Sequence, residues 1–194
     1  MQKFFFRYAI RTLKPVINSM EHTKTTRWDA HNRRVTAIHE SAHAVVALAC
    51  GSRVYDMSIE ASAGPRGPRL GYCAWSTAYD EDRELTIILA GGVAERLWWP
   101  RRSWNNIMYS CYSDYCSVGE IITRLFADMR EQSRFVRVQT RRARAILREY
   151  RQAVDLLATA LDSKGFMGED DICGVVDPFF EQILDEAHND VAGL

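Results

Sequence analysis

The feature that most constrains this chain is the stretch from Val35 to Gly51, VTAIHESAHAVVALACG, which holds two histidines four residues apart. Residues four apart lie one turn above each other on an α-helix, so His39 and His43 can direct both imidazole rings at one point. Apolar residues recur around them at helical spacing, and Gly51 is a natural C-terminal stop. We therefore predict a buried helix that carries a pair of metal-binding histidines.

Glu40 directly follows the first histidine and completes the pattern His-Glu-x-x-His. Because a helical turn holds about 3.6 residues, Glu40 is rotated by about 100° from His39 and flanks the metal instead of binding it. This pattern is typical of zinc peptidases, in which the glutamate is the general base of hydrolysis. The alternative is structural, with two histidines held by core hydrogen bonds beside a surface glutamate.

The composition and the absence of certain motifs argue against several classes of function. The 194 residues are 47% hydrophobic and carry a formal net charge of zero, which gives no overall drive toward nucleic acid or an anionic membrane. No apolar run approaches the roughly 20 residues that span a bilayer, and there is no phosphate-binding loop of the type G-x-x-x-x-G-K-[ST]. The five cysteines are widely spread without a C-x-x-C pair, which favours reduced thiols and a cytoplasmic protein.

The predicted fold class is mostly α (α+β). Residues 1–24 form a basic arm, which is either an amphipathic or leader segment or a piece packed on the domain, and residues 25–194 form the domain itself. The metal helix is predicted over Trp28–Cys50. Two strands, Arg53–Glu60 and Arg69–Trp75, are predicted to pair as a hairpin beside it, joined by a glycine- and proline-rich connection.

The second half of the chain is predicted to be a helical bundle. A helix over Asp80–Trp99 begins with an acidic turn, and its Gly91–Gly92 pair indicates close approach of another backbone, which we expect to be that of the metal helix. Ser113 is expected to cap the helix that follows an irregular loop. The remaining predicted segments are the loop Arg101–Cys111, helices Asp114–Glu131 and Arg134–Leu161, a turn with a short helix over Gly165–Val176, and a terminal helix Pro178–Asp190.

A row of arginines follows one face of the predicted long helix: Arg134, Arg137, Arg141, Arg144, Arg148 and Arg151. Such a row could contact phosphates. However, residues 155–190 hold ten acids against the single base Lys164. We therefore expect charge pairing within the chain or between subunits, and no nucleic-acid partner.

A catalytic zinc needs three protein ligands and an open position for water. No third histidine follows His43 at the spacing of an extended His-Glu-x-x-His motif, so the third ligand must come from a distant part of the chain. Asp114 and Glu95 are the main candidates. The lower-ranked candidates are Cys111, Cys116 and His188.

Five segments in order resemble the zinc peptidase domain of FtsH, the AAA+ membrane protease, across roughly residues 30–176. They are AIHESAHAVVALACG, LGYCAW, LAGGVAERL, SDYCSVGEIITRL, and ILREYRQAVDLLATAL followed by GFMGEDDI. They resemble, in turn, the family's metal helix, its Leu-Gly-Tyr edge strand, its Gly-Gly-x-x-Ala-Glu helix, a later helix that opens with an aspartate, and its closing helix and turn.

The resemblance implies roles for particular residues. His39, His43 and Asp114 would be the zinc ligands, Glu40 the general base, and Glu95 a supporting acid or an alternative ligand. The segment Leu70, Gly71 and Tyr72 would bind substrate, because an open strand edge can hold an extended polypeptide by main-chain hydrogen bonds. Since the ATPase module and membrane anchor of the family are absent from this sequence, we expect a free-standing peptidase domain that works alone or with a separate AAA+ ATPase.

The function predicted from the sequence is therefore that of a zinc metalloendopeptidase acting on unfolded or extended polypeptide. A non-catalytic interaction module that kept the fold and the metal is the alternative, although a purely structural site would not require Glu40. A nucleic-acid-associated protein is a weaker alternative. Assembly of several copies, as in the rings of the FtsH family, is a further expectation.

Overall fold

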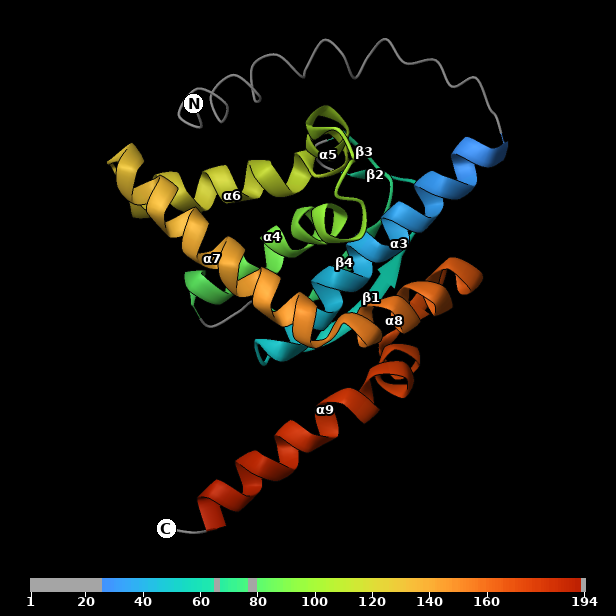
Figure 1. Ribbon diagram of the computed structural model, residues 1–194, viewed down its shortest axis with the longest axis vertical. Helices are drawn as coiled ribbons and strands as arrows, with labels where there is room; N and C mark the ends of the chain where they lie inside the picture. The colour runs from blue at the N-terminus through green and yellow to red at the C-terminus, as the bar shows by residue number, and fades with distance from the viewer. Residues whose placement is uncertain (1–25, 65–66, 77–79, 193–194) are drawn as a thin grey trace.

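The computed structural model describes residues 26–64, 67–76 and 80–192 (Figure 1). The described part is mostly helical with a small antiparallel sheet, which confirms the predicted fold class. The predicted basic arm, residues 1–24, lies outside the described residues. The helices are α3 (Thr26–Ala49), α4 (Glu81–Trp98), α5 (Trp104–Ser110), α6 (Tyr112–Leu125), α7 (Met129–Glu149), α8 (Arg151–Lys164) and α9 (Glu169–Ala192).

The core forms around α3, the predicted metal helix. Its apolar residues are completely buried, among them Ile38, Ala42, Val45 and Val46. Helix α3 packs against α4, α7 and α8 and against strands of the sheet, so it is covered on several sides (Figure 1). The stretch around His39 and His43 therefore lies deep in the molecule.

Three strands form the sheet beside α3, in the order β4-β1-β5. Strand β1 (Val54–Ser58) pairs antiparallel with β4 (Tyr72–Trp75), as predicted, and β5 (Phe166–Gly168) adds on its other side. Strand β4 is thus an edge strand. The connection contains its own hairpin of β2 (Ser62–Gly64) and β3 (Gly67–Arg69), so Arg69 belongs to β3 and not to the predicted second strand.

Helix α4 has the predicted form. Asp80 caps it by accepting a hydrogen bond from the backbone N–H of Arg83 at 2.7 Å, and the acids of its first turn suit the helix dipole. Every residue from Leu85 to Glu95 is buried. This uninterrupted burial reflects contacts with α3, α6 and α7 on different sides of the helix.

Between α4 and α7 the predicted boundaries are wrong. The expected loop over Arg101–Cys111 contains α5, which Ser103 caps through a hydrogen bond from the backbone N–H of Asn106. Helix α6 begins at Tyr112, so Ser113 lies inside it and is not its cap. It ends at Leu125, well before Glu131, because the backbone becomes extended and Asp128 caps the next helix.

The long helix predicted over Arg134–Leu161 is two helices that meet at Tyr150. No glycine or proline marks this break. Tyr150 instead stacks on Phe180 of α9, with ring centroids 4.7 Å apart, so a tertiary contact accompanies the change of direction. The predicted buried stripe is confirmed on both sides of the break, where Ala143, Leu147 and Leu157 are fully buried.

In the segment Gly165–Val176, predicted as a turn with a short helix, the structure has strand β5 and the start of the much longer helix α9. Gly165, at a φ of 80°, ends α8 and turns the chain back toward β1. Helix α9 then runs through Pro178, where the prediction placed a new start. In Figure 1, α9 leaves the body and extends away from it.

Candidate metal centre

His39 and His43 lie one turn apart on α3 and are almost fully buried, at 6% and 2% exposure. Each ring uses its Nδ1 atom to contact α4. His43 Nδ1 lies 2.8 Å from the carbonyl oxygen of Ile87, and His39 Nδ1 lies 3.0 Å from Oε1 of Glu95. Because both partners are acceptors, a neutral histidine carries its proton on Nδ1 and leaves Nε2 as a lone-pair donor.

The two free Nε2 atoms converge on Asp114, in the first turn of α6. They lie 3.0 Å apart, and Oδ2 of Asp114 is 3.0 Å from His39 Nε2 and 3.6 Å from His43 Nε2. In a tetrahedral zinc site with ligands at about 2.0–2.2 Å, the ligand atoms lie about 3.3 Å from one another. The triangle of two nitrogens and one oxygen therefore fits one zinc ion.

Three electron-pair donors that face one another repel unless a cation lies between them. The ionisation of the cluster reflects this. Burial lowers the pKa of His39, but contacts with Cys111, Asp114 and Glu95 outweigh it and raise the pKa well above the usual value. Burial raises the pKa of Asp114, but hydrogen bonds with His39 and His43 outweigh it and lower the pKa. The arrangement favours a positive charge at its centre, either a proton or a metal ion.

Glu95 supports His39 from behind. It is fully buried on α4, its Oε1 faces His39 Nδ1, and its Oε2 lies 2.9 Å from Nε of Arg102. That last contact is an ion pair without the angle of a hydrogen bond. Glu95 thus lies on the opposite side of the His39 ring from Asp114. This is the position of a residue that orients a ligand.

Cys111 gives a second arrangement of donors. Ligand atoms of His39, Cys111 and Asp114 lie within 4.8 Å of one another. However, Cys111 Sγ is 3.9 Å from Nδ1 of His39 and 3.7 Å from Oε1 of Glu95, so it lies on the Glu95 side of the ring. Burial raises the pKa of its thiol to about 11, which disfavours the thiolate that binds metal. The geometry favours His43 over Cys111 as the companion of His39 and Asp114.

Gly91 of α4 allows α3 and α4 to approach this closely, as the glycine pair predicted. A Cβ atom at this position would lie 2.4 Å from Cε1 and Nε2 of His39. Any side chain would therefore displace the ring. The approach is to a side chain of the metal helix rather than to its backbone.

Glu40 and strand β4 meet beside the metal cluster. A Cβ atom on Gly71 would lie 2.8 Å from Oε1 of Glu40 and 2.7 Å from the carbonyl oxygen of Ser58, so only glycine lets the chain pass here. Burial raises the pKa of the Cys73 thiol well above its usual value; the Glu40 charge adds to this rise and the His39 charge opposes it. Strand β4 therefore runs within electrostatic reach of both residues.

The other predicted substrate residues flank Gly71. Leu70 is exposed, and Tyr72, which begins β4, is half-buried. Of the minor ligand candidates, Cys116 lies further along α6, and the side chain of His188 lies outside the described part of the structure.

Sequence reasoning missed three contributors to the site. They are the carbonyl of Ile87, the guanidinium of Arg102, and Trp75, whose ring stacks on His43 with centroids 5.7 Å apart. A backbone carbonyl and a distant arginine leave no local sequence signal. Trp75 lies five residues after Leu70 in the predicted edge strand, which was a usable signal for proximity to the site.

Comparisons with known proteins add no identification, since neither a scan against protein families nor a search of curated proteins finds a match. Among the helices that the structure describes, none combines the length and the apolar character needed to cross a membrane.

Proposed function

We propose that this protein is a zinc-dependent metalloendopeptidase that hydrolyses unfolded or extended polypeptides. The observation that carries the proposal is the convergence of two histidine Nε2 atoms and a carboxylate oxygen at distances that fit zinc. The resemblance of five ordered segments to the FtsH peptidase domain supports the same chemistry.

His39, His43 and Asp114 would hold the zinc ion, with Glu95 and the Ile87 carbonyl fixing the two rings. When bound, zinc supplies a Lewis acid that activates water and polarises a carbonyl group. Glu40, next to His39 on α3, accepts a proton from the attacking water and passes it to the leaving amine. Its confinement beside Gly71 fixes the carboxylate against the strand.

Strand β4 supplies the substrate site in this proposal. One edge of β4 pairs with β1, and the other edge has no neighbour in the three-stranded sheet. An extended polypeptide can add to such an edge by main-chain hydrogen bonds, which a folded substrate offers only after local unfolding. The substrate is therefore unfolded polypeptide, delivered freely or by a separate AAA+ ATPase.

We place this activity in the cytoplasm, because all five cysteines lie in the described residues as free thiols. An interaction module with a retained metal site remains the second candidate, favoured only by the metal cluster itself. The sequence feature that separates the two is Glu40, which a structural site would not need.

Cleavage of denatured casein by the purified protein, without ATP, tests the proposal. The expected result is cleavage that stops on removal of zinc by a chelator and returns on addition of zinc, while a stable folded protein stays intact. Full metal loading without cleavage of any unfolded substrate would favour the interaction module instead.

A further inference from the structure

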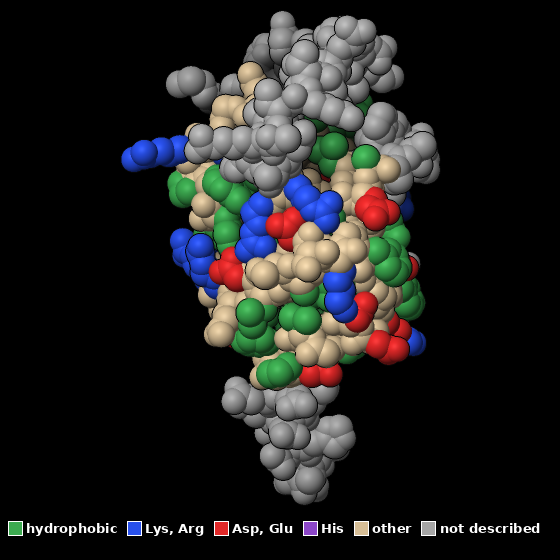
Figure 2. All heavy atoms as spheres, turned by 90° about the vertical axis from the view of Figure 1, so that its right-hand side faces the viewer, with side chains coloured by type: hydrophobic (Ala, Val, Ile, Leu, Met, Phe, Trp, Pro, Cys, Tyr) green, Lys and Arg blue, Asp and Glu red, His purple; other side chains and the backbone are tan. Residues whose placement is uncertain are grey.

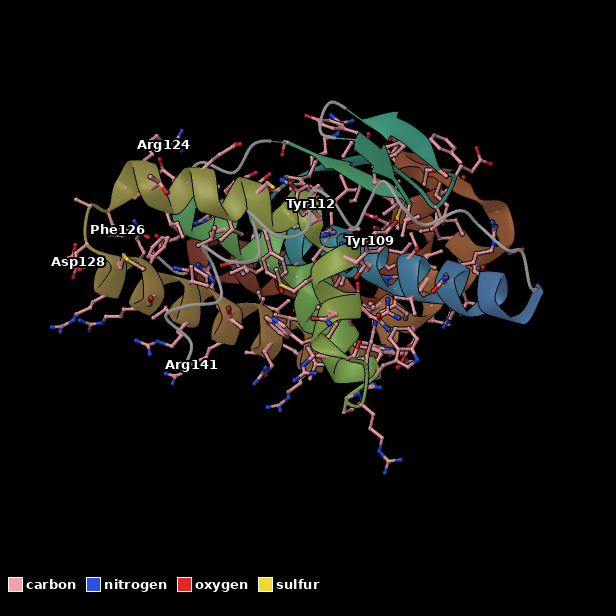
Figure 3. The ribbon with its side chains drawn as sticks, turned by 90° about the horizontal axis from the view of Figure 1, so that it is seen from above. Tyr109, Tyr112, Arg124, Phe126, Asp128 and Arg141 are labelled. Carbon is pink, nitrogen blue, oxygen red and sulfur yellow. The ribbon has the colours of Figure 1, made fainter. Side chains whose placement is uncertain are left out.

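Helix α7 carries a row of like charges that we call the arginine ridge: Arg130, Arg134, Arg137, Arg141, Arg144 and Arg148. Their spacing of three or four residues places them on one face of the helix. All six are exposed. Figure 3 shows Arg141 pointing away from α6, and further nitrogen-tipped side chains project from the same side of α7. The ridge is an exposed basic surface that has no part in the proposed peptidase site.

Of the acids expected to pair with the arginine row, Asp155 pairs with a member of that row and three others pair with bases elsewhere. Arg151, the last member of the predicted row, belongs to α8 and lies 3.9 Å from Asp155. Three more acids of the C-terminal region contact other bases: Asp162 pairs with Arg33, Glu169 with Arg53 and Asp171 with Lys164. Among the ion pairs between described residues, none involves the ridge, so no acid whose side chain the structure describes pairs with it.

The ridge differs in its charge pattern from the face of the molecule that Figure 2 shows. On the face shown in Figure 2, basic and acidic side chains lie interspersed. Residues 129–151, in contrast, hold eight arginines against two acids. Like charges three or four residues apart on a helix repel one another, and no described acid forms an ion pair with these arginines. An anionic partner from outside the chain would remove this repulsion.

The chain itself contains a matching acidic row. Asp170 and Asp177 on α9 are exposed, and Glu181 and Asp185 continue the series at four-residue steps along the same helix. Asp170 and Asp177 form no ion pair with a described residue. Because α9 extends away from the body, this helix is positioned to reach a neighbouring molecule (Figure 1).

We infer that the arginine ridge binds the acidic α9 helix of a second copy of this chain. Each copy carries both surfaces, so in a dimer the ridge of each copy can bind the α9 helix of the other. The stretch 1–20 contains no acid and cannot supply the missing charge. A nucleic acid is a poorer occupant, because the net charge is zero and the ten acids of residues 155–190 repel a polyanion.

Charge exchange tests this interface. One variant carries Arg134→Glu, Arg137→Glu and Arg141→Glu, and the other carries Asp177→Lys, Glu181→Lys and Asp185→Lys. Analytical ultracentrifugation should show that the wild type self-associates at about 50 mM NaCl and dissociates at about 500 mM. Each variant alone should associate at least about tenfold more weakly, while their equimolar mixture should recover association because both contacts again join opposite charges.

A control variant with Arg101→Glu, Arg124→Glu and Arg142→Glu makes the same change in net charge at exposed arginines outside the ridge, and should associate like the wild type. Circular dichroism checks that each variant is folded, and the salt dependence of the wild type tests the inference without any variant. A wild type that is monomeric at every salt concentration would overturn the inference. So would a mixture that fails to recover association, or ridge-dependent binding of duplex DNA, RNA or anionic vesicles by a protein that does not self-associate.

Discussion

At the scale of single residues, each histidine of the candidate metal centre uses one ring nitrogen to contact α4 and turns the other toward Asp114. The Ile87 carbonyl and the Glu95 carboxylate fix the Nδ1 atoms, and Asp114 joins the two Nε2 atoms. The sequence identified the histidine pair as a candidate by its four-residue spacing on a helix. It identified Asp114 as a candidate by its position at the start of a predicted helix. The residue types alone left Asp114 and Glu95 both open, and only the family resemblance favoured Asp114, because the choice depends on which side of the His39 ring each acid occupies.

Asp114→Ala should weaken zinc binding more severely than Glu95→Gln. The first removes an oxygen that faces both Nε2 atoms, whereas the second alters only the group that orients His39. Loss of an orienting partner typically costs about 10- to 100-fold in metal affinity. Competition with a zinc-binding dye measures both constants. Loss of zinc from Glu95→Gln together with tight binding by Asp114→Ala would reverse the assignment.

Cys111→Ala should keep one zinc per chain, because the thiol lies on the Glu95 side of His39 and has a pKa of about 11. His43→Ala should lose the metal, since it deletes one of the three converging donors. Elemental analysis of both variants after dialysis distinguishes the two donor sets. Retention of zinc in His43→Ala with loss in Cys111→Ala would show that the thiol is the ligand.

At the scale of elements, prediction succeeded where local signals were strong. Helix α3, the β1–β4 pairing and α4 follow from periodicity, turn residues and the acidic first turn after Asp80. It failed where tertiary contacts decide. The helix ends at Tyr150, which stacks on Phe180, although the apolar stripe continues on both sides of the break. Strand β5 has only three residues and pairs with β1. Helix α5 has seven residues, too few to show a clear period.

Gly91→Ala should destabilise the protein and reduce zinc binding, even though alanine favours helices by about 1 kcal/mol over glycine. The added methyl group would lie 2.4 Å from the His39 ring, and a ring in a packed core cannot yield freely. Gly174→Ala is the matched control, because nothing lies within 4 Å of its added methyl group in α9. It should stabilise the protein by about 0.5–1 kcal/mol. Chemical denaturation compares the two, and a stabilised Gly91→Ala with full zinc would contradict the close contact.

At the scale of the whole molecule, the fold assembles one site from three separated helices and presents a strand edge next to it. Helix α3 contributes His39, Glu40 and His43, while α4 and α6 contribute Glu95 and Asp114. The chain passes Glu40 at Gly71, directly before the edge strand β4 begins. The order of these segments in the sequence suggested their assembly through a family resemblance, whereas their distances required the three-dimensional structure.

The measurement that tests the central proposal most directly is cleavage of denatured casein by the wild type and by Glu40→Gln at equal, measured zinc content. Glu40 is rotated away from the ligand atoms on α3, so its substitution should leave zinc bound but slow cleavage by at least about 100-fold. Glu131→Gln, an exposed change on α7, should behave like the wild type. Equal cleavage by the wild type and Glu40→Gln at equal zinc content would contradict the account.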